Sequence, residues 1–170
     1  MGIDLEKRLN VGKRAKNFVM PDQNGKDFKL VEFRGKRVLL SFHPLAWTSV
    51  CSEQMKSLEH NKEAFDLLDT IAVGVSCDTV PSKKAWAETL GITGTRLLSD
   101  FWPHGKVAKS YGILLKDDGI SGRSNIVVDE NGTIRLFKNY PLGKLPDIQE
   151  ILDFLAKMPK INSKGRKRKK

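Results

Sequence analysis

The sequence predicts an α/β fold in which a central mixed β-sheet is flanked by helices. Short apolar runs alternate along the chain with segments of helical periodicity, and this alternation is typical of a sheet that helices cover. Near the end of the chain, two strand patterns flank the turn signal Glu130-Asn131-Gly132, which indicates an antiparallel pair and therefore a mixed sheet. Hydrophobic residues make up 39% of the 170 residues, so the chain can bury a proper core and is not disordered as a whole.

The first half of the chain predicts a hairpin, a buried strand, a long helix and a second buried strand. These segments are residues 18–30, 36–44, about 49–68 and 70–76. The hairpin turns at Asn24-Gly25, a strong turn signal. The first buried strand is expected because residues 38–40 form a continuous apolar run, as in strands that are covered on both faces. Thr48 or Ser49 is a natural N-cap of the helix.

The second half predicts a helix, a short strand, a short helix, a β-hairpin and a closing helix. These segments are residues 81–90, 96–100, 105–111, 123–139 and 145–157. Pro81 opens its helix because the first turn does not use the N–H that proline lacks. The closing helix places Ile148, Ile151, Leu152 and Leu155 on one apolar face. The complete order of elements fits a thioredoxin-like α/β fold with an N-terminal β-hairpin extension.

We expect one domain, residues 1–159, followed by a disordered basic tail, residues 160–170. The tail holds seven Lys and Arg residues and no Asp or Glu, and it leaves only +3 of the net charge of +10 to the rest of the chain. It is a solubilising end, a contact for anionic surfaces such as nucleic acid or membranes, or a targeting signal. Because no aromatic residue interleaves its charges, we do not expect nucleic acid or a membrane to be a partner through it.

The cysteine count and the N-terminus bear on the compartment. Two cysteines in 170 residues exclude a disulfide scaffold, and in a reducing compartment each is a core residue or a reactive thiol. No apolar run approaches the ~18 residues that a membrane span needs. Residues 1–16 are charged and lack the apolar core of a signal peptide, so we expect a cytoplasmic protein.

The most informative stretch is residues 43–55, HPLAWTSVCSEQM. A strand is expected to end at Pro44 and a helix to begin near Ser49, which places Cys51 in the first helical turn. The unpaired N–H groups and the positive dipole end of that turn favour a thiolate, the nucleophilic form of cysteine. Thr48 can bring a hydroxyl to the same helix end, and Pro44 can shield the pocket from water without donating a competing N–H.

A thiolate needs a nearby cation, and Arg123 is the best candidate. It begins a predicted strand, and its planar guanidinium can bond several atoms at once. The sequence alone does not place it beside Cys51.

The spacing Pro44-x-x-x-Thr48-x-x-Cys51 resembles the active-site signature of the peroxiredoxins, the alkyl hydroperoxide reductase/thiol-specific antioxidant family. The flanking segments agree with this resemblance. Residues 21–51 resemble the family's N-terminal hairpin, strand and active-site loop, and residues 74–88 resemble its next strand and helix.

The resemblance covers about residues 18–158 and implies a thiol-dependent peroxidase. In the family the Pro, Thr and Cys form the peroxide pocket and an Arg early in a later strand completes it, which corresponds here to Pro44, Thr48, Cys51 and Arg123. The thiolate attacks hydrogen peroxide or an organic hydroperoxide, becomes a sulfenic acid and releases water or an alcohol. The resemblance also implies a homodimer or a larger homo-oligomer, and it requires no cofactor and no metal.

The resemblance leaves the resolving cysteine open. Many family members carry a second Cys that attacks the sulfenic acid, either five residues after the first or in a C-terminal arm. Here Lys56 occupies the first position, and no Cys follows Met158. Cys77 is the only other candidate, and we expect it to pack in the core rather than to resolve Cys51. The chain therefore resembles a one-cysteine type, which an external thioredoxin-like protein or low-molecular-weight thiol reduces.

Other functions of the same region stay open at this point. A thiol–disulfide oxidoreductase would need a second Cys where Gln54 stands, which disfavours it. A redox sensor or a chaperone-like binding module would use the same reactive Cys51, so the motif does not exclude that alternative. Gln54 occupies a position where many family members have Glu, and we expect it to be tolerated. His43 stands where Tyr is common, and we expect it to pack or hydrogen-bond rather than to act as a base.

Overall fold

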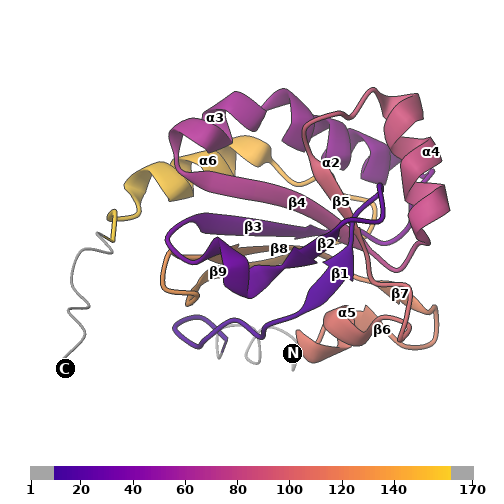
Figure 1. Cartoon of the computed structure of the whole chain (residues 1–170), viewed down its shortest axis with the longest axis horizontal. Coiled ribbons are helices and arrows are strands. Elements are labelled where there is room, and N and C mark those ends of the chain that lie inside the picture. The colour runs from indigo at the N-terminus through magenta and orange to yellow at the C-terminus, as the bar shows by residue number, and fades with distance from the viewer. Residues whose placement is uncertain (1–9, 162–170) are drawn as a thin grey trace.

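The computed structural model describes residues 10–161. They form three layers, with a five-stranded β-sheet as the middle layer (Figure 1). Within this range, four helices cover one face of the sheet, and a hairpin with several short elements covers the other. The strand order is β5-β4-β3-β8-β9. The pairs β3–β4 and β4–β5 are parallel, whereas β3–β8 and β8–β9 are antiparallel. The predicted mixed sheet flanked by helices is thus confirmed.

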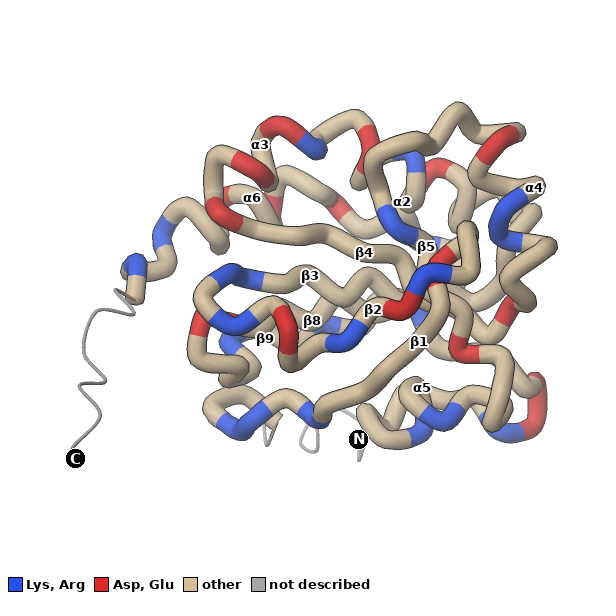
Figure 2. The backbone as a smooth tube through the Cα atoms, in the orientation of Figure 1, with Lys and Arg blue, Asp and Glu red and all other residues tan. Residues whose placement is uncertain are grey.

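The sheet strands are β3 (Arg37–Phe42), β4 (Thr70–Ser76), β5 (Arg96–Ser99), β8 (Arg123–Val128) and β9 (Ile134–Tyr140). β3 lies in the middle and is buried along its whole length. A strand covered on both faces has no polar side, which explains its continuous apolar run. Figure 2 shows β4 without a charged residue, while charged residues lie mainly on the helices and loops.

The helices on the first face are α2 (Ser49–His60), α3 (Lys62–Leu67), α4 (Val80–Leu90) and α6 (Ile148–Lys157). They share one apolar cluster with Leu39 of β3 and Val127 of β8. Thr79 caps α4 by accepting a hydrogen bond from the N–H of Ser82, and Pro81 lies in the first turn as predicted. No helix within the described range is long and apolar enough to cross a membrane.

The second face carries β1 (Val19–Pro21), β2 (Asp27–Lys29), the 3-10 helix η1 (Leu30–Phe33), α5 (Lys106–Ser110), β6 (Leu114–Leu115) and β7 (Ile120–Ser121). The predicted N-terminal hairpin is confirmed as β1–β2. Its turn is closed by Asp22 Oδ1, which accepts the N–H groups of Asn24 and Lys26, and Gly25 supplies the φ of +74° that the turn requires. The short β6–β7 pair was not predicted.

Two predicted helix boundaries are wrong. The helix expected over residues 49–68 is two helices, because Asn61 interrupts it with non-helical backbone and donates its side-chain amide to the Ser57 carbonyl over 2.8 Å. The closing helix begins at Ile148 rather than at residue 145. Pro146 disfavours helical backbone at the preceding residue, and Asp147 then caps the helix by accepting the N–H of Gln149.

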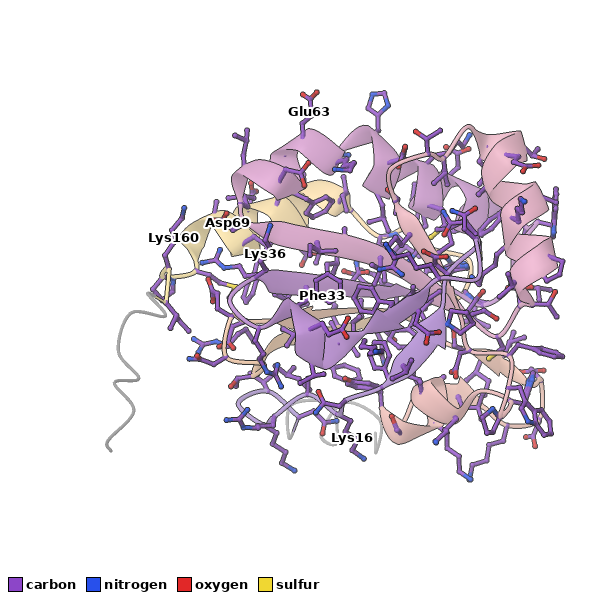
Figure 3. The ribbon with its side chains drawn as sticks, in the orientation of Figure 1. Lys16, Phe33, Lys36, Glu63, Asp69 and Lys160 are labelled. Atoms are coloured by element: carbon purple, nitrogen blue, oxygen red, sulfur yellow. The ribbon has the colours of Figure 1, made fainter. Side chains whose placement is uncertain are left out.

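Arg37 of β3 links the end of α6 to the sheet through hydrogen bonds. This buried guanidinium donates to the carbonyls of Leu155 and Met158 and pairs with Glu130 at 2.9 Å. Beyond it, Lys160 pairs with Asp69 at 3.2 Å, and Figure 3 shows these two side chains close together. Residues 162–170 lie outside the described range, so the division into a domain of residues 1–159 and a disordered tail of residues 160–170 stays a prediction.

Gly74 in β4 sets how closely α2 lies on the sheet. A Cβ atom at this position would collide with Met55 Sδ of α2 and would lie 3.0 Å from Leu97 Cδ2 of β5. The absence of a side chain at Gly74 therefore lets Met55, one turn after Cys51, pack directly on β4.

We predict that Gly74→Ala destabilises the protein by about 1–3 kcal/mol, because the extra methyl group overpacks the contact between α2 and β4. Urea unfolding followed by circular dichroism measures this change. Gly143→Ala is the matched control, since its Cβ would meet open space and the change should stay within about 0.5 kcal/mol. Equal stability of the two variants would contradict the proposed contact.

Candidate active site

The residues between β3 and α2 form a loop that the β4–α4 segment holds in place. The backbone N–H of Ala46 donates to Asp78 Oδ2 over 2.9 Å, and the indole N–H of Trp47 donates to Ser82 Oγ over 3.0 Å. Trp47 has a φ of +70°, which is uncommon for a bulky residue and costs conformational energy. The two hydrogen bonds stabilise the loop in this strained form and thereby determine where α2 starts.

Cys51 lies in the first turn of α2, which follows β3 through the short loop of residues 43–48. Thr48 occupies the N-cap position, and its carbonyl accepts the first helical hydrogen bond, from the N–H of Ser52. The helix offers no carbonyl to the N–H of Cys51, so its positive end faces the sulfur. The side chain is 1% exposed. A thiolate at this position is therefore stabilised by the helix and shielded from bulk water.

Arg123 reaches Cys51 because β8 starts where β3 ends. The antiparallel register pairs Ser124 with Phe42, so Arg123 stands beside the residues that lead into α2. Its Nη1 and Nη2 each lie 3.5 Å from Cys51 Sγ. Its Nε and Nη2 donate to the Leu142 carbonyl over 3.1 and 2.7 Å, which orients the guanidinium. The structure thus brings together the two residues that the sequence could not connect.

Gln54 completes the support of the guanidinium, a role that we did not predict from the sequence. Its Oε1 accepts from Arg123 Nη1 over 2.5 Å, while its Nε2 donates to Ser41 Oγ over 2.8 Å and to the Phe42 carbonyl over 3.2 Å. The spacing from Cys51 was the available signal, because residues three apart share one helix face. As a neutral acceptor, the amide holds Arg123 in place without cancelling its positive charge.

Pro44 and Thr48 lie in the loop on either side of its strained residue. Pro44 is buried and follows the last strand residues by two positions, whereas Thr48 is exposed at the start of α2. The Thr48 hydroxyl donates to the Leu45 carbonyl over 2.8 Å, so its proton is used within the loop and its oxygen is left as an acceptor. Both residues therefore lie in the loop that leads to Cys51, and neither is hydrogen-bonded to its sulfur.

His43 packs below this loop. Its imidazole ring is fully buried, neither ring nitrogen has a hydrogen-bond partner, and its centroid lies 5.4 Å from that of Trp86. Burial lowers the pKa of His43, and the positive charges of Lys83 and Arg123 lower it further. The ring is therefore neutral at physiological pH and packs against the tryptophan, as expected.

With this geometry in place, comparison with known proteins identifies the family. The model of the AhpC/TSA family matches residues 11–137. The chain belongs to the AhpC/TSA family. This membership confirms the peroxiredoxin resemblance and makes the chain a thiol-dependent peroxidase with a thioredoxin-like fold.

Relatives and solved structures agree with this membership. Alkyl hydroperoxide reductase E of Mycobacterium tuberculosis is 40% identical over 149 residues, which cover 87% of this chain and 97% of the relative. Peroxiredoxin-1 of Gekko japonicus is 35% identical over 149 residues, covering 81% of this chain and 74% of the relative. The structure of the reduced 2-Cys peroxiredoxin of Plasmodium vivax superposes with a TM-score of 0.79 and 29% identity, covering 86% of this chain and 80% of that one.

Cys77, the other cysteine of this peroxiredoxin, lies in a different environment from Cys51. It directly follows β4, is 6% exposed and is a free thiol, as Cys51 is. Burial raises the pKa of the Cys77 thiol to about 11, and the carboxylates of Asp100 and Asp78 contribute in the same direction. A thiol that stays protonated at neutral pH is a poor nucleophile, which disfavours Cys77 as a resolving residue.

We predict that Arg123→Met slows the alkylation of Cys51 by iodoacetamide at pH 7 by at least about tenfold, because the thiolate loses a cation at close range. The rate is measured by mass spectrometry of the Cys51 peptide. Arg135→Met is the control, since Arg135 is exposed on β9 and pairs with Asp129 at 3.7 Å, in a part of the sheet that does not contact Cys51. If both variants reacted at the wild-type rate, Arg123 would have no part in activating the thiol.

Proposed function

We propose that Cys51 is the nucleophile of a one-cysteine peroxidase that reduces hydrogen peroxide and organic hydroperoxides. One observation carries this proposal: both terminal nitrogens of Arg123 lie 3.5 Å from Cys51 Sγ at the N-terminal end of α2. A thiolate at this point is stabilised by a helix dipole and a guanidinium together. The same guanidinium faces the region in which negative charge moves from sulfur to oxygen during the reaction.

The chemistry is a displacement at oxygen. The Cys51 thiolate donates an electron pair to one peroxide oxygen, so that an S–O bond forms and the O–O bond breaks. The leaving oxygen departs with the electron pair of the O–O bond, takes a proton and becomes water or an alcohol, while Cys51 becomes a sulfenic acid. Arg123 and the N–H groups of residues 50 and 51 stabilise the moving charge. The Thr48 oxygen accepts a hydrogen bond from the peroxide O–H, and Pro44 shields the pocket from water.

An external thiol completes the cycle. A first thiol condenses with the sulfenic acid to give a mixed disulfide and water, and a second thiol displaces Cys51 and leaves as part of a disulfide. Cys77 takes no part, because its pKa of about 11 keeps it protonated. The donor is a thioredoxin-like protein or a low-molecular-weight thiol. Such donors are abundant in a reducing compartment, which agrees with the cytoplasmic location expected from the sequence.

A groove beside Arg123 supports organic hydroperoxides as substrates. It has a volume of about 610 Å³, and Tyr111, Ile113, Leu114 and Leu142 are among the residues that line it. Apolar walls with a few polar groups are typical of small-molecule sites. An alkyl group would rest on these side chains while the peroxide faces the guanidinium. The Mycobacterium tuberculosis relative carries the name alkyl hydroperoxide reductase, in agreement with this substrate class.

We predict that one equivalent of hydrogen peroxide, added without reductant, increases the mass of Cys51 by one oxygen atom, which mass spectrometry of its peptide detects. Cys51→Ser should consume no peroxide even with an excess of thiol donor. Cys77→Ser is the matched control and should turn over at the wild-type rate. A Cys51–Cys77 disulfide would contradict the one-cysteine mechanism, and an unmodified Cys51 in wild-type protein would contradict the assignment of the nucleophile. A redox sensor would differ by turning over poorly with a generic thiol.

We further propose that the chain associates with copies of itself through the loops at the carboxyl ends of the parallel strands, near Cys51. Large apolar side chains are exposed there, in the loops after β3 and β5: Leu45, Trp47, Phe101 and Trp102. Because β3, β4 and β5 are parallel, the loops that follow them lie at the same end of the sheet. Exposed apolar side chains that lie close together mark interaction surfaces.

We predict a homodimer or larger homo-oligomer in sedimentation experiments, and Trp102→Glu should convert it to smaller species because a charge would be buried in the interface. Leu67→Glu is the control, because Leu67 is 83% exposed and so matches Trp102, which is 82% exposed. Leu67 lies at the end of α3, before the start of β4, and therefore at the opposite end of the parallel strands. A wild-type monomer, or equal effects of both variants, would refute the proposed interface.

A further inference from the structure

Lys83 is a buried cation that the mechanism above does not use. Its side chain is 0% exposed, and its Nζ has no hydrogen-bond partner. Burying an ammonium group without a partner is costly, so proteins rarely do so without a compensating charge nearby. The charge of Lys83 therefore has to be compensated by charged groups that lie close to it.

Lys83 lies in the part of α4 that is hydrogen-bonded to the loop before Cys51 and to the start of α2. Asp78 before α4, Ser82 in its first turn and Trp86 in its second turn bind this loop and the start of α2. Asp78 Oδ2 accepts from the N–H of residue 46, Ser82 Oγ accepts from the indole of residue 47, and the Trp86 indole donates to the hydroxyl of residue 52 over 3.3 Å. Lys83 is thus bracketed by contacts to residues on both sides of Cys51.

Several other charged or titratable groups surround Lys83, and the Asp78 carboxylate has the largest effect on it. They are Asp78, Asp100, Cys77, Cys51 and His43. Asp78 accepts from residues 46 and 76, and the two carboxylate oxygens of Asp100 accept from the N–H groups of residues 107 and 108. Cys77 is a protonated thiol, and His43 is neutral. These hydrogen bonds from neutral groups leave the charge of Asp78 in place, and Cys51 is the group of this set that carries the proposed reaction.

Burial lowers the pKa of Lys83 to about 8, and the charge of the neighbouring Asp78 carboxylate is the largest effect that opposes this shift. The side chain is therefore mostly an ammonium ion at pH 7. In the poorly solvated space between α4 and the start of α2, charge–charge interactions are stronger than in water.

We propose that Lys83 is a positioning residue for the reaction, whose buried ammonium group stabilises the Cys51 thiolate as a second cation. This role rests on the proposed function of Cys51. The two cations approach from opposite sides of β3, because Arg123 belongs to β8 and Lys83 to α4, which packs on the side of β4 and β5. Arg123 contacts the sulfur, whereas Lys83 acts through space. The stabilisation is reciprocal, since the thiolate also stabilises the ammonium ion.

The test is the pH profile of Cys51 alkylation by iodoacetamide, which requires neither peroxide nor turnover. Lys83→Met removes the charge and keeps a side chain of similar length. We expect the midpoint of its profile to lie about one pH unit higher than in wild type, with the same rate on the high-pH plateau. Lys84→Met is the matched control, because Lys84 is the next residue of α4 and is exposed. Its profile should coincide with that of wild type.

A merely structural Lys83 would give a different result, namely a lower unfolding midpoint with an unmoved pH profile, and that outcome would overturn the proposal. The reciprocal measurement covers the case in which Lys83→Met does not fold. In Cys51→Ser, the side-chain NMR titration of Lys83 should move to lower pH than in wild type, because the thiolate is gone. An unchanged titration would also overturn the proposal.

The same experiments separate the two levels of inference. If wild-type protein fails to reduce peroxide while Lys83→Met still shifts the alkylation profile, the proposed function is wrong and the electrostatic role of Lys83 stands. If peroxide reduction proceeds at Cys51 and the profile does not shift, the function stands and the role of Lys83 is wrong.

Discussion

The pairing of β8 with β3 is the constraint on which the candidate active site depends. Because Ser124 pairs with Phe42 at the end of β3, Arg123 lies at the end of the sheet where α2 begins. A shift of this register by one residue would turn the guanidinium to the opposite face and away from Cys51. Both faces of β3 and β8 are buried, so such a shift would also disrupt the packing of the apolar clusters on the two faces. The hydrophobic core therefore fixes the geometry of the chemistry.

The acceptors around Arg123 preserve its charge for the sulfur. Apart from Cys51, the structure pairs the guanidinium with the amide oxygen of Gln54 and the carbonyl of Leu142, both neutral. Gln54 is itself oriented by Ser41, whose hydroxyl donates to Asn125 Oδ1 over 2.8 Å. This chain of neutral groups links α2, β3 and β8. It positions a cation without neutralising it, which a carboxylate partner would do.

Much of the fold could be predicted because local signals and tertiary structure agree. The strand over residues 70–76 coincides with β4, since a continuous apolar run between turn residues has few alternatives. The two hairpins follow from Asn24-Gly25 and from the turn at residues 130–132, where short-range geometry decides. The break at Asn61 was missed because helical periodicity continues across it, while one side-chain hydrogen bond ends α2. The β6–β7 pair has too few residues to produce a pattern.

The sequence by itself determined the family, the mixed α/β fold and the candidate nucleophile, because Pro44, Thr48 and Cys51 lie within eight residues of one another and their spacing on a strand–loop–helix unit is a local property. Only the tertiary structure decided which residues surround the sulfur. Arg123 lies 72 positions away on β8, and Lys83 lies on α4, which packs on the same face of the sheet as α2. Strand register brings Arg123 to Cys51, and helix packing brings the start of α4 to the Cys51 loop; both depend on how apolar faces fit together over the described residues.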